Sequence, residues 1–174
     1  MKVLKFGGTS VGSAQRMKEV AKLITDGERK IVVLSAMSGT TNTLVEISDY
    51  LYKKNPEGAN EIINKLESKY RQHIDELFAT PEYKQKGLEL IKSHFDYIRS
   101  YTKDLFTLFE EKVVLAQGEL ISTALMNYYL QERTRMPSPI RSISRTSSRF
   151  SWNCIRMLRF ISLRGTSAAT PTAR

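Results

Sequence analysis

The chain opens with MKVLKFGGTSVG at residues 1–12, where a short apolar run leads directly into a glycine-rich loop. Residues 3–6 of this stretch predict a first strand, which is too brief to be identified by periodicity alone. The loop brings together one cation, two glycines and two hydroxyl groups: Lys5, Gly7, Gly8, Thr9 and Ser10. Glycine has no Cβ, so it lets backbone amides approach an anion. A helix that starts after the loop adds a positive end, and the stretch therefore favours a phosphate site.

The spacing of this loop matches neither of the two common phosphate loops. A P-loop places its lysine after the glycines, as GxxxxGK[ST], whereas Lys5 precedes them here. GGTSVG is also different from the dinucleotide pattern GxGxxG. On spacing alone, a tight strand-to-helix turn that binds no ligand is as good an interpretation as a phosphate loop.

A second loop of the same kind follows the next apolar run. Residues 31–36 predict a second strand, of the kind that is buried in a parallel sheet. SAMSGTTN, residues 35–42, then supplies glycine and hydroxyl groups before a helical pattern begins. The order strand, loop, helix, strand, loop, helix predicts an α/β fold with helices packed on a parallel sheet. Ligands of such folds bind at the carboxyl ends of the strands, where both loops lie.

Most of the remaining sequence up to Glu132 is predicted to be helical, with breaks at Pro56 and Pro81. Ser13 is a suitable N-cap for the first helix, and the last helix is predicted over residues 118–132. Apolar residues predict one buried side for each of five helices: Ala14, Met17, Val20, Ala21 and Ile24; Leu44, Val45, Ile47 and Leu51; Ile62, Ile63, Leu66, Tyr70, Ile74 and Leu77; Leu88, Ile91, Phe95, Ile98, Tyr101, Leu105 and Leu108; Leu120, Ile121, Ala124, Leu125 and Tyr128. We interpret these residues as core.

The composition excludes several classes of protein. Hydrophobic residues make up 41% and charged residues 26% of the 174, as in globular domains. No apolar run approaches the ~20 residues that span a membrane, and no secretory signal is recognisable. The one cysteine, Cys154, cannot form a disulfide within the chain. His73 and His94 have no cysteine or second histidine near them in the sequence. We therefore predict a cytoplasmic protein without a metal site of its own.

The net charge of +9 is confined to the end of the chain. All 18 acidic residues lie at or before Glu132, where 18 lysines and arginines balance them. Residues 133–174 carry nine arginines and no lysine or acid. A basic nucleic-acid-binding arm is therefore a non-enzymatic alternative, although the segment has few aromatic residues for base stacking. A solvated linker is a second interpretation.

A third interpretation is that residues 133–174 come from a shifted reading frame. Codons for TRMPSPIRSIS, read one nucleotide earlier, can encode KNAEPDPVYI, and NCIRMLRFISLRG can likewise become ELHPDAEIYITQG. The shifted text regains the lysines and acids of residues 1–132. We therefore predict a frameshifted, disordered tail, which the DNA sequence around the codon for Glu132 would test.

Three motifs within residues 1–132, KFGGTSVG, VVLSAMSGTTN and QGELIST, resemble the aspartate kinase family in sequence and in order. The resemblance implies the amino-acid kinase fold, a three-layer αβα sandwich like that of carbamate kinase, with only its N-terminal half present here. It implies ATP-dependent phosphorylation of the side-chain carboxylate of L-aspartate to 4-phospho-L-aspartate, the first step of lysine, threonine and methionine biosynthesis. Mg²⁺ would enter bound to ATP, and intact family members are homodimers.

The same resemblance implies a role for each matching residue. Lys5 would neutralise the transferring phosphoryl group. The pocket for that group would be lined by Gly7, Gly8, Thr9 and Ser10. Ser35 and Thr41 would hydrogen-bond the aspartate, and Glu119 would pair with its α-ammonium group. Without the resemblance, a carboxylate favoured by the dipole of a helix start is an equal interpretation of Glu119.

The sequence departs from the family after Glu132. The family's glycine-arginine-glycine-glycine-serine-aspartate motif, its nucleotide-binding half and its ACT regulatory domains are absent, so we expect little or no kinase activity from these 174 residues. A fusion with homoserine dehydrogenase begins in the same way and stays an alternative. Kinases of glutamate, carbamate or UMP share such loops, but SAMSGTTN and GELIST argue against them. We expect no membrane or nucleic-acid partner.

Overall fold

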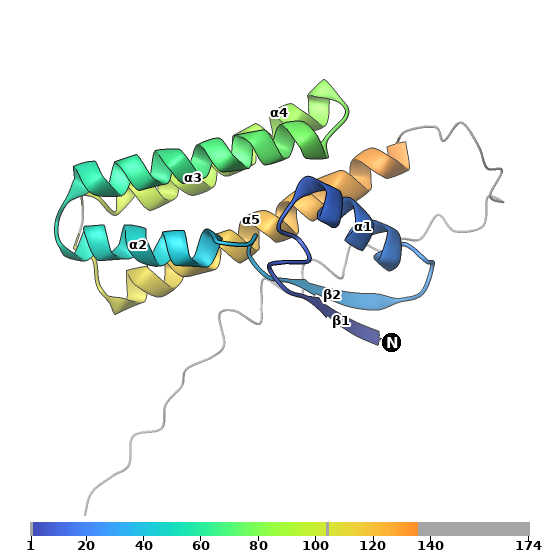
Figure 1. The fold of residues 1–174 in the computed structure, drawn as a ribbon, viewed down its shortest axis with the longest axis horizontal. Helices are drawn as coiled ribbons and strands as arrows, with labels where there is room; N and C mark the ends of the chain where they lie inside the picture. The colour runs from blue at the N-terminus through green and yellow to red at the C-terminus, as the bar shows by residue number, and fades with distance from the viewer. Residues whose placement is uncertain (1, 104, 136–174) are drawn as a thin grey trace, which may run out of the picture. The chain divides into compact units, whose positions relative to one another are not determined.

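Two short strands and five helices make up the part of the chain that the structure, a computed structural model, describes: residues 2–103 and 105–135. The elements are β1 (Lys2–Phe6), α1 (Ala14–Ile24), β2 (Lys30–Leu34), α2 (Thr40–Tyr52), α3 (Pro56–Leu77), α4 (Pro81–Ser100) and α5 (Leu108–Arg135). Figure 1 shows α2, α3, α4 and α5 as a bundle, with β1, β2 and α1 at one end of it. The loops that follow the two strands lie where these two parts meet.

The sheet confirms the parallel strand pair that the sequence predicted. β1 and β2 pair along their whole length, with Phe6 opposite Leu34 at the carboxyl end. The predicted strand over residues 31–36 ends two residues early, because the chain turns into the second loop once the amide of Ser35 has donated to the carbonyl of Phe6. The crossover helix α1 begins where predicted, since Oγ of Ser13 accepts a hydrogen bond at 3.3 Å from a backbone amide of the first turn.

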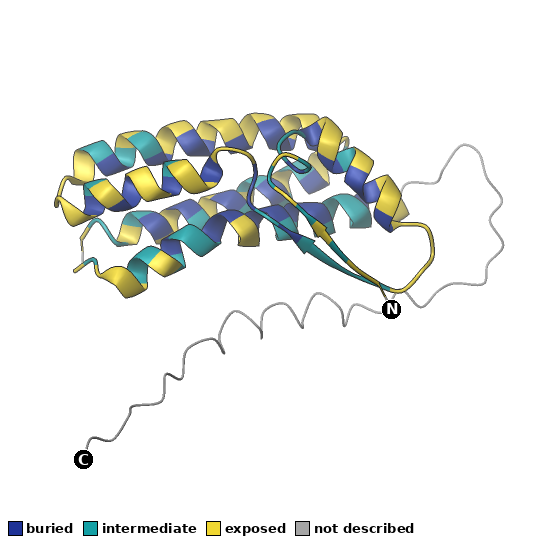
Figure 2. Ribbon diagram, turned by 60° about the horizontal axis from the view of Figure 1, so that its bottom comes forward, coloured by how far each residue is buried: buried dark blue, intermediate teal, exposed yellow. Residues whose placement is uncertain are grey.

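The core of the bundle is built from the apolar helix sides that the periodicity predicted. Figure 2 shows buried residues along the facing sides of the helices. Tyr70 of α3 and Phe95 of α4 are fully buried and meet edge to face, with ring centroids 5.8 Å apart. α5 contacts α2 and α4 within the bundle and also β2 and α1 outside it. It is therefore the element that joins the bundle to the sheet.

Some predicted apolar positions are wrong. α4 ends at Ser100 rather than continuing to Leu108, and Leu105 in the turn that follows is 77% exposed. Val45 and Leu120 continue the helical spacing of their apolar neighbours but are also exposed. Each lies at the edge of its helix's apolar stripe, where spacing alone does not tell whether another element covers the side chain.

The last helix, α5, begins at Leu108, ten residues before its predicted start at Gly118. Thr107 directly precedes α5, and its amide donates to Oε2 of Glu110 at 2.9 Å, as in the reciprocal half of a capping box. Gly118 is consequently an interior residue of α5. Its helix-breaking tendency of about 1 kcal/mol is overcome by the packing described below.

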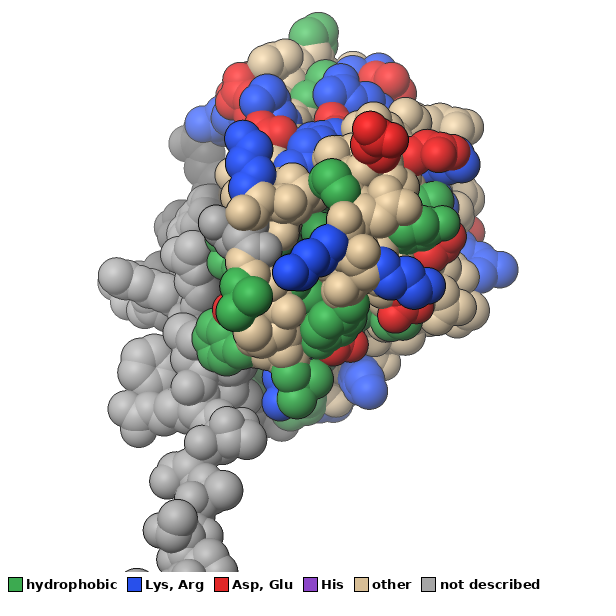
Figure 3. All heavy atoms as spheres, turned by 90° about the vertical axis from the view of Figure 1, so that its left-hand side faces the viewer, with side chains coloured by type: hydrophobic (Ala, Val, Ile, Leu, Met, Phe, Trp, Pro, Cys, Tyr) green, Lys and Arg blue, Asp and Glu red, His purple; other side chains and the backbone are tan. Residues whose placement is uncertain are grey.

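The end of the bundle away from the sheet carries exposed apolar side chains, and Figure 3 shows them gathered on this face. We call it the distal tip, and its exposed members are Tyr52, Tyr97, Leu105, Leu108 and Phe109. The ring of Phe106 packs against the ring of Tyr52, with centroids 4.9 Å apart, and against the half-buried ring of Tyr101, with centroids 6.0 Å apart. Apolar side chains gathered in this way are typical of a surface that another molecule or segment covers.

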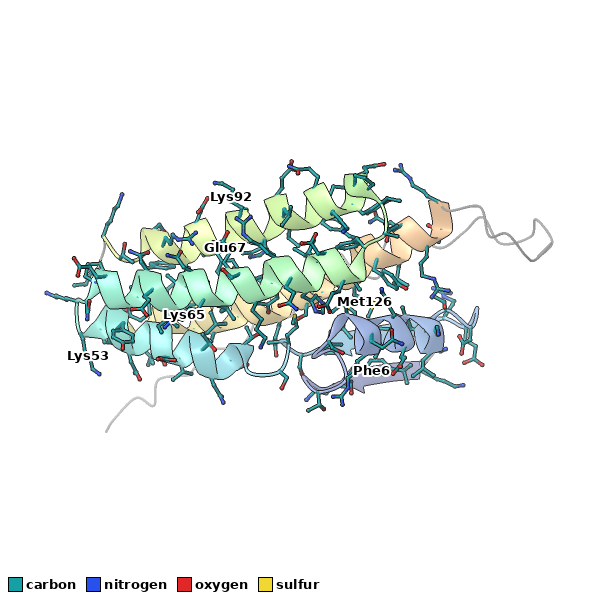
Figure 4. The ribbon with its side chains drawn as sticks, turned by 45° about the horizontal axis from the view of Figure 1, so that its top comes forward. Phe6, Lys53, Lys65, Glu67, Lys92 and Met126 are labelled. Atoms are coloured by element: carbon teal, nitrogen blue, oxygen red, sulfur yellow. The ribbon has the colours of Figure 1, made fainter. Side chains whose placement is uncertain are left out.

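An ion-pair network ties α3 to α4 beside the core. Glu67 of α3, labelled in Figure 4, accepts hydrogen bonds at 2.6 Å from Arg71 of its own helix and from Arg99 of α4. Burial opposes ionisation of Glu67, but the two guanidinium groups outweigh it and hold the pKa of Glu67 below its ordinary value. The network thus keeps a charged carboxylate at the edge of an apolar interface and orients α4 on α3.

The described residues belong to one compact unit. α5 continues to Arg135, three residues past the predicted domain boundary at Glu132. We predicted that residues 133–174 are disordered, come from a shifted frame or bind nucleic acid. Beyond Arg135 these predictions fall outside the described part of the chain. No described helix is both long enough and apolar enough to cross a membrane.

Candidate functional site

The first glycine loop passes from β1 to α1 through a tight turn. The amide of Ser10 donates to the carbonyl of Gly7 at 2.9 Å, which closes the turn. Arg16 of α1 reaches back to the loop, and its Nη1 donates to the carbonyl of Thr9 at 2.7 Å. Within residues 2–103 and 105–135, the amides of Gly8 and Thr9 donate to no backbone carbonyl. These two donors of the loop are therefore available to an anion.

The first loop packs directly on the second, residues 35–39. A Cβ on Gly8 would lie 2.8 Å from the carbonyl oxygen of Ala36, and one on Gly12 would lie 3.0 Å from Cβ of Ser38. A side chain at Gly8 would therefore force the two loops apart. By contrast, apart from the chain neighbours of Gly7, no atom of the described residues lies within 4 Å of its Cβ position. Gly8 lets the loops touch, whereas Gly7 faces open space.

Gly118 brings α5 against the same loop. Its Cβ position lies 2.8 Å from Cβ of Ala36 and 2.9 Å from Cγ2 of Thr40, so even alanine would be too large. The next residue, Glu119, is exposed. The three sequence motifs therefore converge on Ala36, and the only acidic residue among them is presented at the surface beside this contact.

The second loop enters α2 at Gly39, whose φ of 81° is the left-handed conformation that favours glycine. Thr40 is buried, and its hydroxyl lies 3.0 Å from the hydroxyl of Tyr70. Burial raises the pKa of Tyr70 to about 12, against the effect of this hydrogen bond, so the phenol is protonated at neutral pH. Lys69 of α3 donates from Nζ to the carbonyl of Ser38 at 2.9 Å. Two neighbouring residues of α3 therefore hold the start of α2.

The structure places the predicted site residues around these contacts. The strand-end loops carry Gly7, Gly8, Thr9, Ser10 and Ser35. Thr41 is exposed in the first turn of α2, and Glu119 is exposed on α5. Lys5 is exposed on β1, and it forms no ion pair with any residue of the described chain. None of these roles is tested by geometry alone, and each stays a prediction.

Three residues at the loops escaped the sequence analysis. Arg16 and Lys69 are charged residues on helices, a pattern typical of solvated positions, and Tyr70 was assigned only to the core. Their partners are backbone carbonyls or hydroxyls that lie up to 31 residues away in the sequence. No local pattern signals such contacts, because they depend on how α1 lies against the first loop and how α3 packs beside the second loop.

A shallow hollow of about 310 Å³ lies beside the first loop and α1. Its lining residues are Phe6, Thr9, Ser10, Arg16, Glu19, Val20 and Leu23. Only Thr9 and Ser10 among the predicted site residues line it, so the hollow is not the convergence point at Ala36. Over the described ranges, no three His, Cys, Asp or Glu side chains gather where they could hold a metal ion.

The two adjacent glycines should differ sharply on substitution. Gly8→Ala is expected to lower the free energy of unfolding by about 2 kcal/mol, because its Cβ meets a backbone oxygen that cannot move without separating the loops. Gly7→Ala, the matched control, is expected to change it by less than about 0.5 kcal/mol. Urea unfolding at neutral pH measures both. Equal losses from the two variants would contradict the loop contact.

Glycine loops at the carboxyl ends of two parallel strands, held together by a glycine of a later helix, define an α/β protein, and ligands of such folds bind at the carboxyl ends of the strands. The chain belongs to the amino acid kinase family, whose model matches residues 1–159. This match runs past Glu132, the predicted end of the kinase part, so the domain boundary at that residue stays a prediction.

The relatives within this family are aspartokinases. Aspartokinase 2, chloroplastic, of Arabidopsis thaliana is 36% identical over 142 residues, which cover 75% of this chain and 24% of that protein. The aspartokinase of Chlamydia trachomatis serovar D is 33% identical and covers 73% of this chain and 27% of its own length. The bifunctional aspartokinase/homoserine dehydrogenase of Buchnera aphidicola is 29% identical, with 76% and 17% covered. The chain thus spans about a quarter or less of these relatives.

Solved structures agree with the fold class predicted from the sequence. E. coli aspartokinase III in complex with aspartate and ADP, in its R-state, superposes with a TM-score of 0.63 at 26% identity over 77% of this chain and 29% of that chain. The T-state of the same enzyme, in complex with lysine and aspartate, gives a TM-score of 0.63 at 28% identity. The predicted fold class is therefore confirmed: the described residues form a mostly helical part of an amino-acid kinase domain with a small parallel sheet.

Proposed function

We propose that this chain carries the part of an aspartokinase site that binds L-aspartate and positions the transferring phosphoryl group. The reaction of the whole site would be ATP-dependent phosphorylation of the aspartate side-chain carboxylate to 4-phospho-L-aspartate. The convergence of the three glycine motifs on Ala36 carries the proposal. It gathers a cation, several hydroxyl groups and one carboxylate around a single pair of strand ends, and a zwitterionic substrate and a phosphate need this combination of groups.

The first loop would handle the phosphoryl group. Phosphoryl transfer requires positioning and stabilisation of negative charge rather than covalent help from the protein. The amides of Gly8 and Thr9 are available as donors, and the open space at Gly7 leaves room for phosphate oxygens. Ser10 would line the same space, and Lys5, exposed at the strand end without an ion-pair partner in the described chain, would neutralise the developing charge.

The second loop and α5 would hold the amino acid. Ser35 begins this loop and Thr41 lies in the first turn of α2 that follows it, and their hydroxyls can each donate to a carboxylate or accept from an ammonium group. Glu119 is exposed beside the loop contact, and a carboxylate is the natural partner of the α-ammonium group of aspartate.

ATP and Mg²⁺ are the proposed co-substrate and cofactor. The described residues offer no cluster of metal ligands, and Mg²⁺ would arrive bound to the nucleotide phosphates. The residues that hold the adenosine end of ATP in the family have no counterpart among the motifs of this chain. We therefore infer that the 174 residues alone have little or no kinase activity.

The type of aspartokinase that carries this site, its location and its partners are also proposals. Both monofunctional aspartokinases and bifunctional aspartokinase/homoserine dehydrogenases match the chain, so either context fits the site. We expect the enzyme to lie in the cytoplasm, to form a homodimer and to have no nucleic-acid partner. The basic residues 133–174 carry the only sequence signal for nucleic-acid binding.

A chimeric enzyme would test the function directly. Residues 1–132 joined to the remaining catalytic part of Arabidopsis aspartokinase 2 should make aspartyl phosphate from ATP and L-aspartate, measured by hydroxylamine trapping. The 174-residue chain should be at least about 100-fold slower. In the chimera, Lys5→Met should lower kcat about 100-fold, and Glu119→Gln should raise KM for L-aspartate about tenfold.

Lys2→Met is the matched control for Lys5→Met, because both lysines are exposed on β1 and Lys2 pairs with Glu28 at 2.7 Å, away from the loops. It should leave kcat and KM unchanged. A folded chimera that makes no aspartyl phosphate would overturn the proposed function, and an ordinary rate from the 174 residues alone would overturn their inferred inactivity.

A further inference from the structure

Two consecutive residues of α3 bind the second loop through different chemistry. Tyr70 is fully buried, and its hydroxyl lies 3.0 Å from that of Thr40 at the start of α2. Lys69 is exposed, and its ammonium group donates to the carbonyl of Ser38 at 2.9 Å. Consecutive side chains of a helix point in directions about 100° apart, so Lys69 and Tyr70 contact the loop from two different sides. One contact is fixed within the core, whereas the other is made in solvent.

The two exposed residues of this loop, Ser38 and Gly39, differ in their support: the carbonyl of Gly39 accepts from the amide and the hydroxyl of Thr43 at 3.1 and 3.0 Å, whereas the carbonyl of Ser38 accepts from Lys69. Gly39 caps α2 with no side-chain hydrogen bond, and it is held in the left-handed conformation. Glycine is the residue that loses most conformational freedom on ordering, so this position is costly to fix. Ser38 and Gly39 are both exposed and so gain little from burial. The nearest side chain to the Cβ position of Gly39 is Lys69, whose Nζ lies 3.6 Å away.

We propose that Lys69 is a positioning residue for the amino-acid substrate: it fixes the Ser38–Gly39 peptide and through it the placement of Thr41. The inference rests on the proposed function for the identity of the substrate. The contact itself stands on the geometry of α3 and the loop. An ammonium group on a carbonyl is a charge-assisted hydrogen bond, about twice as strong as a neutral one. In an exposed loop with no side-chain cap, this contact opposes opening of the turn before Thr41.

Lys69→Met tests the role, because methionine keeps the apolar stem and removes the ammonium group. In the 174-residue chain, amide hydrogen exchange of residues 37–42 should become about fivefold faster, while the midpoint of thermal unfolding stays within about 2 °C. Affinity for L-aspartate, measured by calorimetric titration, should fall about fivefold. Lys69→Arg should restore both quantities, since a guanidinium group can donate to the same carbonyl.

Lys65→Met is the matched control. Lys65 lies one turn earlier on α3, is exposed, and pairs with Glu61 at 2.6 Å within its own helix. It should change neither loop exchange nor affinity. Unchanged exchange in Lys69→Met, or the same acceleration in Lys65→Met, would overturn the proposal. If the wild-type chain binds no L-aspartate, the proposed function is at fault, and the exchange measurements still decide whether Lys69 holds the loop.

Discussion

Replacing Glu132 by alanine is expected to lower the free energy of unfolding by about 3 kcal/mol, one of the two largest effects that we predict for this chain. Glu132 lies near the end of α5 and is only 3% exposed. Its Oε1 accepts hydrogen bonds from the amide of Ala79 at 3.0 Å, and from the amide and the hydroxyl of Thr80 at 2.7 and 2.6 Å. Alanine would remove the acceptor of all three donors at once.

The position of this carboxylate explains the size of the expected effect. Thr80 is the N-cap of α4, but its side chain caps no amide of that helix. Glu132, which lies on α5, supplies the acceptor that the cap of α4 lacks. Its carboxylate also places a negative charge beside the positive end of α4. Bonds to an ionised acceptor contribute about 1.5–3 kcal/mol each, and the partly exposed turn recovers some of this loss by hydration.

Chemical denaturation at pH 7.5 measures this loss. Glu132→Gln should cost less than Glu132→Ala, because an amide oxygen still accepts from the turn. Glu89→Ala is the matched control: Glu89 is exposed on α4 and accepts from Gln85 of the same helix at 2.8 Å, so its removal should cost less than about 0.5 kcal/mol. A Glu132→Ala loss no larger than that of Glu89→Ala would show that α5 does not tie down this turn.

His73 should make the folded chain sensitive to mild acid. Its side chain is buried on α3, and its Nε2 has no hydrogen-bond partner among the described residues. Burial lowers the pKa of His73 to about 4, with Lys69 and Lys18 lowering it further and Glu76 opposing them. The unfolded chain has the ordinary value of about 6.5. Below that pH the unfolded state therefore binds a proton that the folded state excludes.

The two pKa values of His73 set the direction of this effect and its pH range. The contribution of His73 to the free energy of unfolding is fully present above about pH 6.5, falls as the pH drops, and has decreased by about 3 kcal/mol below pH 4. Between pH 7.5 and pH 5 the His73 contribution amounts to about 2 kcal/mol. Carboxylates such as Glu67, whose pKa is lowered, begin to lose their own contribution only below about pH 4.5.

Urea unfolding of the wild type and of His73→Leu at the two pH values isolates this contribution. Leucine fills a similar volume and cannot take up a proton, so the difference in unfolding free energy between pH 7.5 and pH 5 should shrink by about 2 kcal/mol in the variant. An equal pH dependence in both proteins would mean that the imidazole is protonated in the folded state or that the pocket around it opens.

The local chemistry of the N-terminal residues was enough to predict the strands, the first helix and both loops. A glycine pair after an apolar run, a serine before a helical spacing and an uninterrupted apolar strand are signals read within a few residues. The family followed from the same stretches, because KFGGTSVG, SAMSGTTN and GELIST are specific combinations of residue types. The prediction was wrong where a tertiary contact overrides local helix propensity. Glycine is typical of a helix boundary, but α5 continues through Gly118 because this residue packs against Ala36.

The sequence by itself determined the α/β class, the family and the identity of the candidate site residues, since each depends on residue types close together in the chain. Only the tertiary structure decided why Gly8 and Gly118 must be glycine, as both lie against Ala36 in a loop that is distant from each in sequence. It also decided that Lys69, Tyr70 and Glu132 support loops and turns of other elements. Spacing along a helix predicts which side is apolar, but the partner that each polar side chain reaches depends on how the helices pack in three dimensions.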